Sequence, residues 1–297
     1  MTGADDSWRH YRSSHFELLS HNSDARSLQL LRNLEMLHAV FFDALHLEQR
    51  RPLDVLVYFF GSDREFRVFA PPAMKSNKRL AGYYLPRADH AVIVVPPDGD
   101  TAEARRTIFH EYTHHLTFIS GESPALWYAE GIAELLSTVT ETSKGLVLGT
   151  PIPGHVGCLQ NEKFLPLNVL FNVRHNSAIY NEGGSRTGIF YAESWALMHY
   201  LYFGHSGLPM NGVDSFFHYT LQESETGDPE KRRESFENSF GLNYAVMEQR
   251  LRSYVEDGRY SVAQLPLPKR DSVESYAVRP VSLGESEGRL LELDFRL

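Results

Sequence analysis

The segment HEYTH at residues 110–114 carries the side chains best suited to chemistry in this chain. Its two histidines, His110 and His114, are four residues apart, and Glu111 follows the first. On a helix, residues i and i+4 lie on one face a turn apart, so both imidazoles can reach one metal ion. Glu111 would face the same side, where a carboxylate can take a proton from metal-bound water. The alternative is a solvated or hydrogen-bonded histidine pair, because the chain holds 14 histidines.

The next apolar segment, WYAEGIAELL at 127–136, supplies a candidate third ligand. Glu130 follows His114 by 130 − 114 = 16 residues and falls on the next helix, within reach if the two helices pack as a hairpin. Glu134 comes one turn later, where it can accept a hydrogen bond from a ligand histidine and fix its orientation. Alone, the two carboxylates would indicate a solvated helix face. Neighbours such as Trp127 are too apolar for such a face, and a carboxylate among them needs a partner, for which we expect a metal ion.

The composition restricts how a metal can be held. Cys158 is the single cysteine of the chain, so neither a disulfide framework nor a cysteine-rich metal site is available. The ligands must be histidines and carboxylates. HExxH is the spacing of a zinc site with an adjacent general base, so we expect Zn²⁺ as the cofactor.

HEYTH followed by WYAEGIAE resembles the gluzincin metallopeptidases, in which HExxH lies on one helix and a ligand glutamate on the next. The closer resemblance is to the peptidase-MA-like bacterial domains of largely undefined function, which share a W-x-x-E-G-x-A-E type segment and a later tyrosine-containing helix similar to FYAESWALMHYL at 190–201. It covers roughly residues 16–204. The resemblance implies a zincin-like fold, a zinc-dependent metallopeptidase activity and a peptide or protein substrate. The site that it implies has His110, His114 and Glu130 as ligands and Glu111 as the general base. Glu134 would bond to a ligand side chain and not to the metal.

Two features argue against the thermolysin-type subfamily. Glu134 stands where those enzymes have aspartate, and the interval from His114 to Glu130 is shorter than theirs. The strand AVIVV at 91–95 is also similar to the edge strand on which gluzincins lay an extended substrate, which would be peptide binding by strand addition.

Hydrolysis by such a site also needs a group that stabilises the developing oxyanion. Tyr191 is the first candidate, because it opens an apolar helix after the glycine-rich loop NEGGSRTG. An ordinary core tyrosine explains Tyr191 equally well. Tyr180 and His175, in the same region, are the alternatives.

The remaining pattern predicts an α+β protein, in which strands come first and helices later. Leucines at steps of three and four predict a long helix from Ser23 to about Gln49. Strands are expected at 54–61 and in LAGYYL and AVIVV, the last two as an antiparallel hairpin. The active-site helix pair follows at 101–120 and 124–140, then a loop-rich stretch from 144 to 186, then helices at 188–204, 211–223, 229–239 and 243–257.

We expect a single zincin-like catalytic domain over residues 1–262. It would have an N-terminal lobe with a small mixed or antiparallel sheet over about 1–122, and a mainly helical lobe over about 123–262. Residues 263–297 read as an extended segment. The strand-like ending GRLLELDFRL suggests that the natural chain continues.

The net charge of −9 argues against nucleic acid or an anionic membrane as the main partner. No apolar run approaches the ~20 residues of a membrane span, so we expect a soluble protein without an integral membrane segment. The first 16 residues contain no signal peptide, so localisation is open: periplasmic or secreted if a leader preceded them, otherwise cytoplasmic.

Two other functions fit the pattern less well. A catalytically weak or inactive zincin-fold module could bind a peptide or partner protein, although a pure binder has no need of Glu111. A structural metal in an interaction scaffold fits least, because three protein ligands leave a coordination position open.

Overall fold

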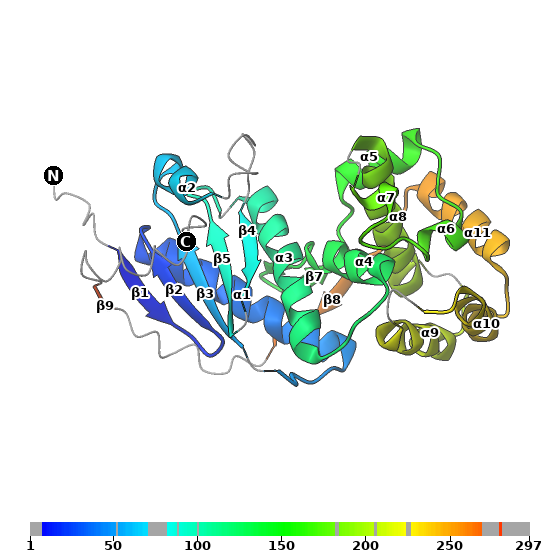
Figure 1. Ribbon diagram of the computed structural model, residues 1–297, viewed down its shortest axis with the longest axis horizontal. Coiled ribbons are helices and arrows are strands. Elements are labelled where there is room, and N and C mark those ends of the chain that lie inside the picture. Colours follow the sequence, from blue (N-terminus) through cyan, green and yellow to red (C-terminus); the bar gives the residue numbers. More distant parts are fainter. Residues whose placement is uncertain are drawn as a thin grey trace. The chain divides into compact units, whose positions relative to one another are not determined.

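The computed structural model describes residues 8–51, 53–70, 82–87, 89–99, 101–181, 184–204, 207–223, 227–268 and 279–280. The chain forms two compact units. One consists of residues 1–119 and 268–297, and the other of residues 120–267. The first holds a mixed sheet with helices, and the second holds a smaller antiparallel sheet and further helices (Figure 1). The predicted α+β class is therefore confirmed. The two lobes that we predicted divide near residue 122, whereas the units divide after Ile119 and the first unit resumes at Pro268.

The sheet of the first unit has the strand order β4-β5-β3-β2-β1-β9. Strands β2 (Phe16–Ser20), β3 (Asp54–Phe59) and β5 (His90–Val95) run parallel to one another. Strands β1 (Arg9–Arg12), β4 (Tyr83–Pro86) and β9 (Arg279–Pro280) pair antiparallel with their neighbours. The parallel strands lie in the middle of the sheet, which agrees with their nearly continuous apolar sequences.

The expected hairpin of LAGYYL and AVIVV is confirmed, because β4 pairs antiparallel with β5 in the register Tyr83↔Val94. The position that we assigned to AVIVV was wrong. Strand β5 pairs with β3 on one side and β4 on the other, so it is an inner strand. Among the described residues, β4 forms that edge of the sheet. An all-apolar run such as AVIVV is buried on both faces, and five consecutive residues of β5 are buried, which an edge strand with an open side seldom achieves.

Helices cover both faces of this sheet. On one face, α2 (Asp63–Phe69) contributes Phe66 to an apolar cluster with Tyr58 of β3 and Val94 of β5. On the other, α1 (Asp24–Leu45) runs across the strands, and its stripe is buried as predicted, with Leu31 fully covered (Figure 1).

Helix α3 (Ala102–Ser120) contains HEYTH, and a turn leads from it to α4 (Leu126–Leu136). Both helices lie within the predicted ranges. In α3, Phe109, Tyr112, Leu116 and Ile119 form a buried stripe, as their spacing predicts. Helix α3 is therefore anchored along one side, and this anchoring restricts the positions of its histidines.

The second unit is mainly helical after its small sheet. Helices α8 (Gly184–Phe203), α9 (Met210–Gln222), α10 (Pro229–Phe240) and α11 (Tyr244–Asp257) confirm the four predicted helices to within a few residues. Helices α4 and α8 pack with almost no space at Gly131, where a Cβ would lie 2.6 Å from Cγ of Met198 and 2.7 Å from the carbonyl oxygen of Ser194. No helix among the described residues is long and apolar enough to span a bilayer.

The stretch from 144 to 186 is more regular than predicted. It contains β7 (Gly145–Leu148) and the helices α5 (Pro153–Asn161), α6 (Leu167–Leu170) and α7 (Ala178–Asn181). Strand β7 pairs with β6 (Thr140–Thr142) and with β8 (Ala263–Leu265), which opens the predicted extended segment. Helix α5 gave no periodic signal because only Leu159 of its nine residues is buried. Beyond residue 268, only Arg279–Pro280 belong to the described part of the chain.

Candidate metal centre

His110 and His114 present their imidazoles side by side on α3. Their Nε2 atoms are 3.1 Å apart, and the ring planes meet at 78°. In a tetrahedral zinc site with bonds of about 2.1 Å, neighbouring ligand atoms are about 3.4 Å apart. The histidine pair therefore has nearly the spacing that two ligands of one ion require.

Glu111 is half-buried on the same helix and lies near the edge strand β4. Burial raises the pKa of the Tyr84 phenol on β4 to about 12, and the charge of Glu111 is a smaller cause in the same direction. The Tyr84 hydroxyl lies 2.8 Å from Nδ1 of His115. His115 is buried and stacks on Tyr112.

Glu130, the predicted third ligand, is 2 % exposed on α4. The residues around it, including Trp127 and Ile132, are fully buried or nearly so, as the apolar sequence predicts. Its Oε1 accepts a hydrogen bond from the hydroxyl of Tyr180 at 2.9 Å. A carboxylate at this depth is costly unless it is paired, because burial removes its hydration.

The ligand atoms of His110, His114 and Glu130 all lie within 4.8 Å of one another. No other group of three or more histidine, cysteine, aspartate or glutamate residues with such spacing occurs in the described part of the chain. Two imidazoles and one carboxylate form a donor set that suits zinc and leaves a fourth position open for water or substrate.

Glu134 has a histidine partner that the sequence did not suggest. Its Oε2 lies 3.0 Å from Nε2 of His155 on α5. This partner lies on a helix in a stretch that we expected to be loop-rich. That Glu134 accepts a hydrogen bond from a ligand histidine stays a prediction. Nothing in the spacing of His155 along the sequence connects it to Glu134.

Tyr180, His175 and Tyr191 gather into one aromatic cluster. The ring centroids of Tyr180 and Tyr191 are 6.1 Å apart at an angle of 28°, and His175 meets Tyr180 edge-on at 5.5 Å. Tyr191, our first candidate for the oxyanion-stabilising group, is half-buried on α8. It is Tyr180, named only as an alternative, whose hydroxyl bonds directly to the candidate ligand Glu130.

A scan against protein-family models finds no match to this chain, and a search of curated protein sequences finds none either.

Proposed function

We propose that this protein is a zinc-dependent hydrolase of peptide bonds. The observation that carries the proposal is the convergence of His110, His114 and Glu130, with ligand atoms within 4.8 Å of one another, beside a glutamate in the HExxH position. The resemblance of HEYTH and WYAEGIAE to gluzincin metallopeptidases supports the same function, and so does the mixed sheet that precedes the helix pair.

In this proposal His110, His114 and Glu130 would hold the ion, and neighbouring residues fix the position of these side chains. The two histidines are fixed by the buried stripe of α3, and Glu130 is held by the hydroxyl of Tyr180. Zinc held there would lower the pKa of a coordinated water and polarise a substrate carbonyl. Glu111 would be the general base that accepts a proton from water and passes it to the leaving amine.

The edge strand β4 offers a way to bind an extended peptide. Its outer side carries no strand among the described residues, so a substrate can pair with its backbone by strand addition. Tyr84 on β4 lies near Glu111 and bonds to His115, so this edge of the sheet lies beside the helix that carries the proposed general base. The substrate class that follows is a peptide or an extended segment of a protein.

In this proposal the oxyanion is stabilised by a residue of the aromatic cluster of His175, Tyr180 and Tyr191. Tyr180 and Tyr191 both carry a hydroxyl that can donate to a developing negative charge. The hydroxyl of Tyr180 bonds to Glu130, so we assign Tyr180 the role of holding this ligand. Tyr191, the first candidate from the sequence, keeps the proposed role of the oxyanion donor.

Metal content tests the proposal directly. We would measure zinc by elemental analysis in the wild type, in His114→Ala and in Glu130→Gln, with His218→Ala as the control, since His218 is an exposed histidine on α9. We expect about one zinc per chain in the wild type and the control, and much less in the other two variants. A wild-type protein that binds no zinc after supplementation contradicts the proposal.

Cleavage of a peptide library by the zinc-loaded protein then tests the activity. Turnover that is lost on chelation and restored by zinc supports a peptidase. Saturable peptide binding without cleavage at full zinc occupancy would show instead a binding module that keeps the metal site.

A further inference from the structure

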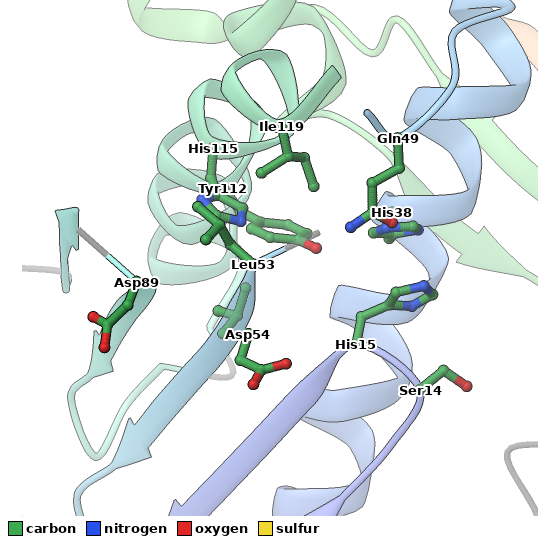
Figure 2. A pocket seen from close by; sticks show the side chains of 11 residues that line it. Ser14, His15, His38, Gln49, Leu53, Asp54, Asp89, Tyr112, His115 and Ile119 are labelled. Atoms are coloured by element: carbon green, nitrogen blue, oxygen red, sulfur yellow. The ribbon is translucent and has the colours of Figure 1, made fainter. Parts of the chain in front are cut away.

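The first unit contains a polar cavity of about 260 Å³. Its walls come from the turn between β1 and β2, from α1, from the start of β3, from the residue before β5 and from α3 (Figure 2). None of its lining residues is one of the proposed metal ligands. The volume lies just below the usual range of ligand pockets, so it suits a short molecule.

Two buried histidines on the cavity wall each have one ring nitrogen without a hydrogen-bond partner among the described residues, while the His38 side chain also hydrogen-bonds to Gln49. His38 is 8 % exposed and His115 is 1 % exposed, and Nε2 of each has no hydrogen-bond partner. Buried polar atoms nearly always have a partner, so these two nitrogens indicate a ligand that can bond to them. In Figure 2 the hydroxyl of Tyr112 also points across the cavity, toward His38 and Gln49.

The charge of the cavity selects the ligand. Its described lining includes the carboxylates of Asp54 and Asp89 and no lysine or arginine. Burial lowers the pKa of His38 to about 4, so its imidazole is neutral and can accept a hydrogen bond near pH 7. Arg51, which lies close in sequence, places its guanidinium over the ring of Phe118.

Aromatic surface adds to this preference for a cation. The rings of His15 and His38 are stacked with centroids 3.7 Å apart, and the Tyr112 ring lies opposite them (Figure 2). Nδ1 of His15 lies 2.6 Å from Oε2 of Glu35, and this pairing holds the His15 ring in place. Carboxylates combined with ring faces are the elements that recognise organic ammonium groups.

We propose that this cavity binds a small organic cation, an amine or guanidine group on a short aliphatic chain. The N–H groups of the ligand donate to the carboxylate of Asp54 and to Nε2 of His38. Its methylene groups lie against the ring faces of Tyr112 and His15. Asp89 contributes charge from the rim, where its carboxylate already lies 2.7 Å from Nδ1 of His90.

Calorimetric titration of the full chain with n-butylammonium, butyramide and butyrate separates charge from size, because these probes are nearly equal in length. We expect the ammonium ion to bind most tightly. Asp54→Asn, which keeps the shape of the side chain, should weaken its binding about fivefold or more, as expected for one lost charge pair. His38→Phe, which keeps a ring for stacking and removes the nitrogen, should weaken binding as well.

Asp43→Asn is the matched control, because Asp43 is an exposed aspartate of α1 outside the cavity lining. It should bind n-butylammonium like the wild type. The proposal is overturned if butyrate or butyramide binds as tightly as the ammonium ion, if none of the probes binds, or if Asp54→Asn and Asp43→Asn have the same affinity for n-butylammonium.

Discussion

The hydroxyl of Tyr180 donates a hydrogen bond to Oε1 of Glu130 at 2.9 Å, and so joins the one-turn helix α7 to a carboxylate in the middle of α4. The bond fixes which way the carboxylate faces. A residue that holds a metal ligand in this way contributes to metal affinity without touching the metal.

Tyr180→Phe should therefore lower zinc affinity by about 10- to 100-fold, the usual effect of losing a group that orients a ligand. Competition with a fluorescent chelator measures this affinity. Tyr191→Phe is the control, because it removes the same atom from the neighbouring ring of the cluster. Equal zinc affinity in Tyr180→Phe and the wild type would show that Glu130 does not need this bond to hold a metal.

Glu111→Gln should retain zinc and lose peptide hydrolysis by about 10²- to 10⁴-fold, because the amide cannot accept the proton from water. Zinc content and turnover are measured on the same preparation. Glu103→Gln, an exposed change in the first turn of the same helix, should leave both unchanged. Wild-type turnover in Glu111→Gln would remove Glu111 from the mechanism.

Gly131→Ala should destabilise the fold by about 1–3 kcal/mol, because the new Cβ would overlap Met198 and the backbone of Ser194 on α8. Gly157→Ala in α5 is the matched control. A Cβ there meets no atom within 4 Å, so this change should stabilise the fold by about 0.4–1 kcal/mol. Urea unfolding measures both values, and a neutral Gly131→Ala would mean that α4 and α8 separate more easily than their packing suggests.

Glu193 should make the free energy of unfolding depend on pH. Burial raises the pKa of this carboxyl from 4.5 to about 8, so the folded chain holds its proton more tightly than the unfolded chain. The resulting stabilisation is fully present below pH 4.5 and is lost as the pH rises through about 8.

Glu193→Gln should remove this part of the pH dependence, because an amide does not titrate, while its oxygen can still accept the hydrogen bond from the backbone N–H of Leu165. Urea unfolding at several pH values between 4.5 and 8 provides the comparison. Glu256→Gln, an exposed change on α11, should keep the wild-type slope. An unchanged slope in Glu193→Gln would assign the pH dependence to other groups.

The helices and the metal-ligand candidates were predictable because their signals are local. HEYTH lies within two turns of α3, and the apolar positions of α3 and α4 repeat with the period of a helix. The same holds for α8 to α11. In each case the periodicity of the apolar residues predicts both the helix and the face of it that is buried.

What the sequence did not show are contacts between residues far apart along the chain. Tyr180 and Glu130 are separated by 50 residues, and no pattern links them before the chain folds. The pair of Glu134 and His155 depends on α5, which has little apolar periodicity. The inner position of β5 depends on strand order, which spacing along the chain does not determine.

The way the chain connects the two units also determines when, during synthesis, the sheet of the first unit can be completed. Strand β9 pairs with β1, so the sheet of the first unit needs residues 279–280, which follow the whole of the second unit along the chain. Translation delivers all of residues 120–267 before it delivers β9. The unit that leaves the ribosome first is therefore the last to obtain its complete sheet.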